Sequence, residues 1–479
     1  QRDAVLGVWP TGEAARDLAA TAEYLKRQPS LPALLRDVDA GRKPMAIQPR
    51  SGVPGLAEQI ALFRTFRDHG ATALSYQVDS LTRNNNYAGA ADAIRQSERE
   101  GKALLNGFPV INHGVPGLRH VVEEIGVPIQ TRHSTRDPRL LAEISYAGGV
   151  TAFEGGAICY NIPYYKDFKP SDSIAVWQYV DRLTGYFAEE HGIVLDREFF
   201  GTLTGTLIPP CFALVTNILE AVLAAAQGVR CVSLAYAEQG HRAQDIAAIR
   251  VMASLGREIL ARQGFEGVAV HTVFHQYMAA FPPSERKAEE LIFASAVTAT
   301  LARATRLITK TPAEARKIPT LDDNLRGLAL ARMGLRAAHH FAIDEAAVAY
   351  EADILRREVL AIIDSLLEAG DGDLTSGISR GFERGLLEVP FAPSVHNRGE
   401  VMTARDNDGA VRFLRTGNLQ FDQDVREFHE QKMAERRSAE GDPSDRADAL
   451  LVEADVLRIA REEYESWPLD EPPSDLAID

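Results

Sequence analysis

The feature that most constrains this fold is an alternation of short apolar runs with longer amphipathic segments, which begins at Met45. Strand-type runs separated by helical segments indicate parallel strands joined by right-handed crossovers. The nine strand candidates lie at residues 45–50, 71–79, 103–109, 127–132, 151–155, 200–205, 229–236, 267–276 and 305–312.

Two architectures are compatible with this alternation. A closed barrel of eight βα units needs about 250 residues, and the repeat extends over roughly 270. An open doubly wound sheet usually carries a glycine-rich phosphate turn after an early strand. Neither GxGxxG nor GxxxxGK[ST] occurs in the chain. We therefore expect an α/β fold of the (β/α)8 TIM barrel type, in which one of the nine candidates lies outside the barrel or is misassigned.

The flanking segments have a different character. Residues 1–44 are expected to form a helical N-terminal extension and residues 45–330 the catalytic barrel. Residues 331–479 predict a mostly helical C-terminal region. Within it, residues 401–418 predict a β-hairpin whose turn is DNDG. A chain of 479 residues is too long for one ordinary core, which agrees with this division.

Composition excludes several classes of function. The net charge of −15 argues against a nucleic-acid partner, because phosphate binding needs a basic face. The three cysteines include no CxxC pair, which excludes a cysteine-based zinc site and is typical of a reducing compartment. His271 and His275 lie in an expected strand, so they do not form a zinc helix, and no metal site is predicted. Without a membrane span or signal peptide, a cytoplasmic location is expected.

Charged residues stand at the ends of several strand candidates. Arg50, Arg83 and Arg132 follow the first, second and fourth candidates, Glu154 ends the fifth and Lys310 ends the last. In a barrel these ends meet at one mouth. Three guanidinium groups there suit two carboxylates, because each is a planar fork. We therefore expect an acidic amino acid as substrate, with Glu154 facing its ammonium group.

Each of these residues also has a purely structural interpretation. Tyr160 and Tyr164 could orient the substrate or simply pack. Glu154 could pair with one of the arginines. Residues 311–314 match a capping box with proline at the first helical position, which would explain Glu314 without a ligand. Lys310 could instead serve a Schiff-base lyase or aldolase.

The order of several short motifs resembles one known family. The motifs are QPRSGV, LTRNNNY, LLNGFPVINHGV, TRHST, EGGAICYNIPY, LTGTLIPP, TVFHQYM and TKTPAEA. Together they are similar to the large (epsilon) subunits of glutamate mutase, also called methylaspartate mutase. The resemblance extends from about Arg50 to at least Glu314, and continues more weakly through EVPFAPSVHN and ARDNDGAVRFLRTGN.

The resemblance implies an isomerase that uses adenosylcobalamin. In that family a (β/α)8 barrel closes over the cofactor, which a separate small (sigma-type) subunit holds through a DxHxxG motif. That motif is absent from this chain. The implied assembly is a heterotetramer that contains a homodimer of this chain. The implied reaction interconverts L-glutamate and (2S,3S)-3-methylaspartate by cobalt–carbon homolysis, hydrogen abstraction and migration of a glycyl fragment.

The resemblance also assigns roles to residues at the expected barrel mouth. Arg50, Arg83 and Arg132 resemble an arginine claw that holds the two substrate carboxylates. Glu154 resembles the acid that meets the substrate amino group.

The remaining implied contacts come from four residues. Tyr160 and Tyr164 would lie beside the substrate amino group. Lys310 and Glu314 resemble a pair that touches the adenosine ribose.

Four positions depart from the expected family pattern. A basic residue is expected at Asn86, glycine at Ser134 and Ala157, and serine at Cys159. These departures leave open a related mutase that acts on a different amino acid in natural-product biosynthesis. A non-catalytic scaffold is a further alternative.

Overall fold

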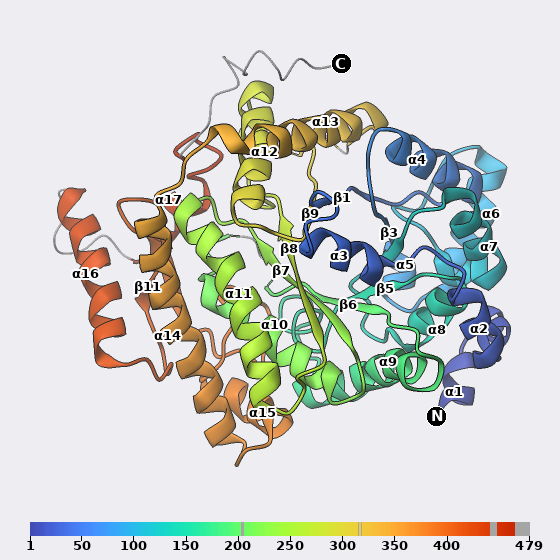
Figure 1. The fold of residues 1–479 in the computed structure, drawn as a ribbon, viewed down its shortest axis with the longest axis horizontal. Coiled ribbons are helices and arrows are strands. Elements are labelled where there is room, and N and C mark those ends of the chain that lie inside the picture. Colours follow the sequence, from blue (N-terminus) through green and yellow to red (C-terminus); the bar gives the residue numbers. More distant parts are fainter. Residues whose placement is uncertain (203–205, 315, 318, 441–447, 465–479) are drawn as a thin grey trace.

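The computed structural model describes residues 1–479 except 203–205, 315, 318, 441–447 and 465–479. Its centre is a set of parallel strands enclosed by helices (Figure 1). The strands are β1 (Ala46–Gln48), β2 (Arg50–Ser51), β3 (Leu74–Gln77), β4 (Ile129–Arg132), β5 (Ala152–Glu154), β6 (Asp196–Phe199), β7 (Cys231–Ala237), β8 (Ala269–His275) and β9 (Arg306–Ile308).

These strand segments close into the predicted eight-position barrel. The order runs β1-β9-β8-β7-β6-β5-β4-β3-β2, and each neighbouring pair is parallel. β1 and β2 are consecutive parts of one run, separated only by Pro49, which has no N–H to donate to a ladder. Nine segments therefore occupy eight positions, and the (β/α)8 fold is confirmed.

Two strand predictions were wrong. Residues 103–109 form no strand, and lie between α6 (Tyr87–Glu100) and α7 (Val110–Ile125). Only Phe108 makes an isolated bridge, to Val78 just after β3, so the apolar run continues the edge of a strand without adding one.

The second wrong prediction concerns residues 200–205. The strand is β6, which ends at Phe199; residues 200–202 are not in a strand, and residues 203–205 lie outside the described ranges. The apolar pattern did not indicate β6, because the sequence of this strand is DREF. Its three charged side chains are nevertheless buried, since each has a charged or hydrogen-bonding partner in the interior.

Helices cover the outside of the barrel. Those that follow the strands are α4 (Leu56–Asp68), α5 (Ser80–Arg83), α6, α7, α8 (Arg139–Ala147), α9 (Pro170–His191), α10 (Pro210–Ala225), α11 (Arg242–Arg262), α12 (Glu285–Leu301) and α13 (Leu321–Ala337). α10 is buried at every residue because it packs between the barrel and a C-terminal helix. Such a helix is apolar on all sides. Within the described ranges, no helix is long and apolar enough to span a bilayer.

The N-terminal segment is helical as predicted, with α1 (Arg2–Leu6), η1 (Pro10–Ala15), α2 (Leu18–Leu25) and α3 (Leu31–Asp39). Leucines of α3 pack against Ala46, Ala73 and Ala152, which stand at the starts of β1, β3 and β5. α3 therefore helps to close the amino end of the barrel and leaves the opposite end for a site.

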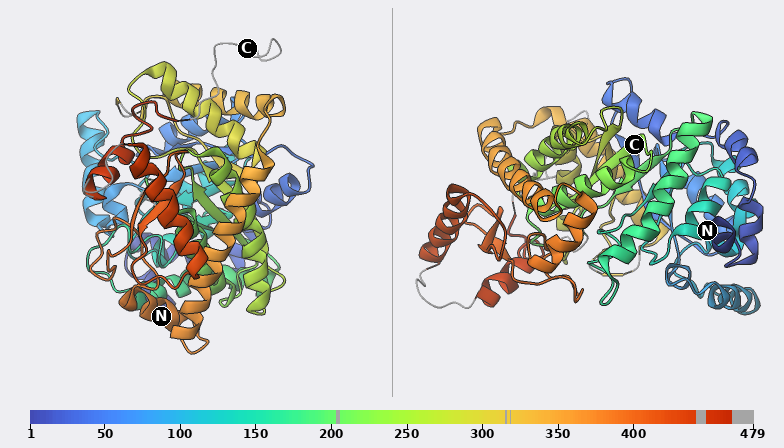
Figure 2. Two further views of the ribbon diagram at one scale, coloured as in Figure 1. Left: turned by 90° about the vertical axis from the view of Figure 1, so that its left-hand side faces the viewer. Right: turned by 90° about the horizontal axis from the view of Figure 1, so that it is seen from below.

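The C-terminal segment contains η2 (Ala338–His340), α14 (Glu345–Ala369), α15 (Leu374–Arg384), the predicted antiparallel hairpin β10 (Met402–Arg405) and β11 (Val411–Arg415), α16 (Gln423–Ala439) and α17 (Asp448–Val456). Figure 2 shows the hairpin and α16, in red, on one side of the molecule. The hairpin is tied to loops at the carboxyl end of the barrel: Thr403 donates to the Leu207 carbonyl at 2.6 Å, and Arg405 donates to the Gln239 carbonyl at 2.6 Å. The expected division at residue 330 falls inside α13.

Candidate active site

A pocket opens at the carboxyl end of the barrel. Six of the eight residues predicted for the site line it, namely Arg50, Arg83, Arg132, Glu154, Tyr160 and Tyr164. They come from β2, α5, β4, β5 and the loop that follows β5. The prediction that these strand ends meet at one mouth is therefore confirmed by the fold.

Glu154 is held by two side chains and is completely buried. Arg132 donates through Nη2 to Glu154 Oε1, and the Tyr160 hydroxyl donates to Oε2 at 2.5 Å. The pairing of Glu154 with a rim arginine, expected as an alternative, is thus present. Burial raises the pKa of Glu154 to about 7; Arg132 opposes this rise and the carboxylate of Glu198 adds to it. Glu154 can therefore gain or lose a proton near neutral pH.

Glu198 is a member of the site that the sequence reasoning missed. It lies directly opposite Glu154 in the register of β5 and β6. Arg132 Nη1 donates to Glu198 Oε1 at 2.9 Å, and Arg306 Nη2 donates to Oε2 at 2.5 Å. A correct placement of β6 would have shown the signal, because a glutamate at an inward position of a buried strand needs a cationic partner.

Two of the three arginines have no acidic partner among the described residues. Arg50 donates through Nη1 to the Met278 sulfur at 3.5 Å, and through Nη2 and Nε to the Gln77 amide oxygen at 2.8 and 3.2 Å when that oxygen faces the guanidinium. The Nε of Arg83 is buried and has no hydrogen-bond partner in the described part of the chain. Among the described residues no carboxylate neutralises the charge of Arg50 or Arg83, whereas Arg132 is already shared between two carboxylates.

The paired glycines after Glu154 are required by close packing. Gly155 has φ +103°, and a Cβ there would lie 2.3 Å from the Tyr160 ring. A Cβ on Gly156 would lie 2.4 Å from the Glu220 carboxylate. That carboxylate accepts hydrogen bonds from the backbone of residues 158 and 159 at 2.7 and 2.9 Å. The tight turn therefore brings Tyr160 back onto Glu154.

Tyr164 and the last two predicted residues lie further out. The Tyr164 ring is 41% exposed and meets Tyr160 edge to face, with 5.5 Å between ring centroids. Lys310 and Glu314 follow β9 and pair with each other, with 2.7 Å between Nζ and Oε2. Neither lines the pocket. Burial, helped by the charge of Arg50, lowers the pKa of Lys310.

The capping box considered for residues 311–314 is not formed. These residues make a turn, and in the described part of the chain the Thr311 hydroxyl has no hydrogen-bond partner. A capping box stands instead at the start of α13, where Thr320 and Asp323 bond reciprocally. Glu314 is thus free of the structural role that would have explained it.

The geometry agrees with the comparison to known proteins. The sequence model of the methylaspartate mutase E chain matches residues 29–461. The chain belongs to this family. A protein named glutamate mutase epsilon subunit from Treponema denticola is 41% identical over 92% of this chain and 91% of its own length. Proteins of the same name from Desulfitobacterium hafniense and Halobacterium salinarum are 43% and 40% identical, and each covers 92% of this chain.

Of the four positions at which a departure from the family pattern was expected, Ser134 alone lines the pocket. Asn86 is exposed and caps α6, since its side chain accepts from Gly89 N at 2.9 Å. The Ala157 carbonyl accepts from Ser173 at 2.8 Å, and Cys159 is buried on the turn that Glu220 holds. The other three positions therefore lie outside the wall of the pocket.

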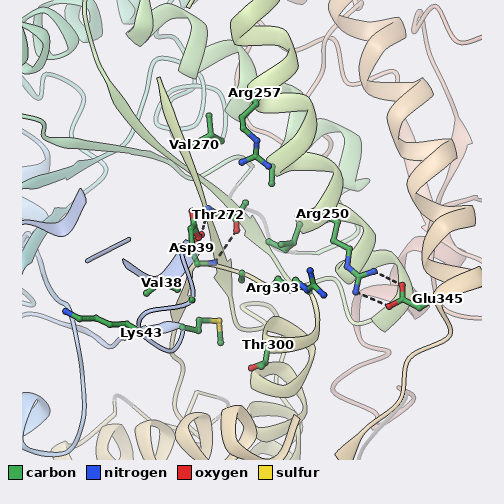
Figure 3. A pocket seen from close by; sticks show the side chains of 17 residues that line it. Val38, Asp39, Lys43, Arg250, Arg257, Val270, Thr272, Thr300, Arg303 and Glu345 are labelled. Atoms are coloured by element: carbon green, nitrogen blue, oxygen red, sulfur yellow. Dashed lines mark hydrogen bonds and ion pairs between the residues drawn. The ribbon is translucent and has the colours of Figure 1, made fainter. Parts of the chain in front are cut away.

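A larger cavity, of about 760 Å³, lies beside the starts of β8 and β9 at the other end of the barrel (Figure 3). Asp39 in its wall is already engaged by His271 at 2.7 Å and Thr305 at 2.6 Å, and Glu345 is paired with Arg250. Among the residues described here, no group of three His, Cys, Asp or Glu side chains is placed to hold a metal. Active sites of such barrels lie at the carboxyl end of the strands, so the mouth pocket is the candidate active site.

Proposed function

We propose that this chain is the large subunit of an adenosylcobalamin-dependent isomerase that interconverts L-glutamate and (2S,3S)-3-methylaspartate. One observation carries the proposal. The forks of Arg50 and Arg83, which lack acidic partners among the described residues, line the same pocket as Glu154 in a chain of the methylaspartate mutase E chain family. An amino dicarboxylate has the charges that such a pocket requires.

The arginines act by binding and orientation. Arg50 and Arg83 present bidentate donors to the substrate carboxylates. Arg132 adds a third guanidinium, whose position is fixed by its hydrogen bond to Glu198. Holding both carboxylates limits the rotation of the carbon skeleton between them, which favours one rearrangement over side reactions.

Glu154 and Tyr160 act on the amino group. The Glu154 carboxylate accepts hydrogen bonds from the substrate ammonium, and Tyr160, 2.5 Å away, orients it. The His133 ring stacks on Trp177 and meets the Tyr160 ring edge-on, with centroid distances of 5.7 and 5.2 Å. This aromatic wall keeps water from the reacting carbons, as radical chemistry requires.

The residues after β9 fit the nucleoside part of the cofactor. Lys310 and Glu314 place a donor and an acceptor side by side, which suits the two hydroxyls of a ribose. Between them in sequence stands Thr311, whose buried hydroxyl has no hydrogen-bond partner among the residues that the structure describes. When bound, adenosylcobalamin supplies the radical that removes and returns a substrate hydrogen. The chain lacks DxHxxG, so a small sigma-type subunit supplies the cobalt-binding histidine, in a heterotetramer built on a homodimer of this chain.

The test is reconstitution. The chain is mixed with a cobalamin-binding small subunit, adenosylcobalamin and L-glutamate, and the product is analysed for 3-methylaspartate. Formation of methylaspartate only when all components are present is expected. Turnover of a different amino acid, but not of glutamate, would instead identify a related mutase. Labelling of Lys310 by borohydride in the presence of substrate would favour a Schiff-base enzyme, which family membership does not.

A further inference from the structure

Glu198 occupies an unusual position beneath the pocket. It is completely buried and does not line the pocket. Its two oxygens accept from Arg132 at 2.9 Å, from Arg306 at 2.5 Å and from Gln130 at 2.7 Å, and His275 Nε2 lies 3.4 Å away. Four barrel strands, β4, β6, β8 and β9, thus meet at one carboxylate.

This arrangement divides the Arg132 guanidinium into two arms. Nη1 points to Glu198 and also approaches Gln130 Oε1 at 3.3 Å. Nη2 points to Glu154, which does line the pocket. A guanidinium is planar and rigid, so fixing one arm fixes the direction of the other. Nη2 therefore keeps its direction while Nη1 stays on Glu198, and only the acceptor that meets Nη2 can change.

We propose that Glu198 is a positioning residue for substrate binding, which anchors one arm of Arg132 so that the other arm can pass from Glu154 to a substrate carboxylate. This inference rests on the proposed function. When a substrate carboxylate replaces Glu154 as the acceptor of Nη2, Glu154 is released to meet the ammonium group. Glu198 itself touches no substrate and acts through Arg132 alone.

The charges around both acids support this role. Arg132, Glu198, Tyr160 and Arg50 act on Glu154. Burial alone would raise the pKa of Glu198, but Arg306 and Arg132 together hold it well below its usual range. The permanent negative charge of Glu198 offsets part of the positive charge of Arg132. Arg132 therefore stabilises the ionised form of Glu154 less, and Glu154 can be either protonated or ionised.

The remaining ionisable neighbours of Glu198 do not replace it. Burial lowers the pKa of His275 to about 3, so this ring stays neutral at the pH of interest. Asp196 is the first residue of β6, two residues before Glu198, and its carboxylate lies 3.8 Å from Arg306. Removal of the Glu198 charge would therefore make Arg132 the full counter-ion of Glu154.

The test compares Glu198→Gln with a matched control. In the C-terminal region Arg412 is likewise shared between two buried carboxylates, Glu351 and Asp406, so Glu351→Gln is the control. The titration of Glu154 is followed in the isolated chain by infrared spectroscopy, with its carboxyl band assigned by loss in Glu154→Gln. We expect Glu198→Gln to move this titration down by about one pH unit or more, because a like charge has been removed. The control should not move it.

Kinetics of the reconstituted enzyme provide the second measurement. Glu198→Gln should raise KM for L-glutamate by about tenfold or more with a smaller effect on kcat, since Nη2 stays with Glu154. Glu198→Asp keeps the charge but shortens the reach. It should raise KM while leaving the titration where it is in wild type, and it decides the question if the glutamine variant does not fold.

Two results overturn the inference. One is a Glu154 titration in Glu198→Gln that coincides with wild type; the other is an unchanged KM in both variants. A wild-type chain that makes no methylaspartate in reconstitution refutes the proposed function instead, while the infrared titration still decides whether Glu198 controls the Arg132–Glu154 pair.

Discussion

Replacement of Glu154 by glutamine is the most informative single change in the pocket. The side chain is completely buried and accepts hydrogen bonds from Arg132 and Tyr160. Glutamine keeps the shape, removes the negative charge and turns one acceptor into an NH2 donor. In the substrate complex this donor would face another donor, the ammonium group.

The expected size follows from the contact that is lost. A hydrogen bond to a charged group contributes about 1.5–3 kcal/mol. Loss of one such contact corresponds to a roughly 10- to 150-fold change in an equilibrium constant. Wild type should therefore bind L-glutamate more tightly than glutarate, which lacks only the amino group, and Glu154→Gln should lose most of that preference.

The assay is competition binding of L-glutamate and glutarate to wild type and to the variant, each with an intact fold by circular dichroism. If Glu154 serves only to hold Arg132, both ligands would weaken equally and their ratio would stay constant. An unchanged ratio would refute the assignment of Glu154 to the amino group.

The same residue predicts a pH dependence. Because burial raises the pKa of Glu154 to about 7, the preference for glutamate over glutarate should increase as pH rises through 7 and should be flat in Glu154→Gln. For stability the sign is opposite. The native pKa exceeds the unfolded value of about 4.3, so the native state binds more protons between these values, and the stabilising contribution is lost as pH rises through 7. Thermal unfolding at pH 5 and pH 8 should show a smaller difference in the variant than in wild type.

Three further predictions follow from neighbouring parts of the structure. Arg83→Lys should raise KM for L-glutamate by about tenfold or more without lowering the melting temperature. Arg132→Lys should raise KM and also lower the melting temperature, because Arg132 lies between two buried carboxylates. Wild-type kinetics in both variants would exclude an arginine claw. In denaturant unfolding, Gly155→Ala should destabilise the fold by about 1–3 kcal/mol, because the new Cβ meets Tyr160. The control is Gly192→Ala, which is also at positive φ but has no atom within 4 Å of the new Cβ. It should cost about 1 kcal/mol or less. The isolated chain should bind adenosylcobalamin weakly in equilibrium dialysis and strongly only with a small subunit; tight one-to-one binding by the chain alone would contradict a two-component enzyme.

The sequence alone determined the barrel and half of the residues that line the pocket. Most strands buried between a core and a helical layer are apolar, so their positions are visible as runs separated by amphipathic helices. Chain order then places every strand end at the same mouth. Arg50, Arg132 and Glu154 could be predicted as neighbours because each ends or directly follows such a run.

Only the tertiary structure decided which of these charges are already neutralised. The anchor of Arg132 is Glu198, 66 residues away, and the second cation on that carboxylate is Arg306, a further 108 residues on. Hydropathy treats DREF as exposed, because a charge is stable in a barrel interior only when folding brings its counter-charge from another strand. That pairing depends on strand register and side-chain reach. For this reason Arg50 and Arg83, which have no carboxylate partner among the described residues, could be distinguished from Arg132, which is shared between two carboxylates, only in the folded barrel.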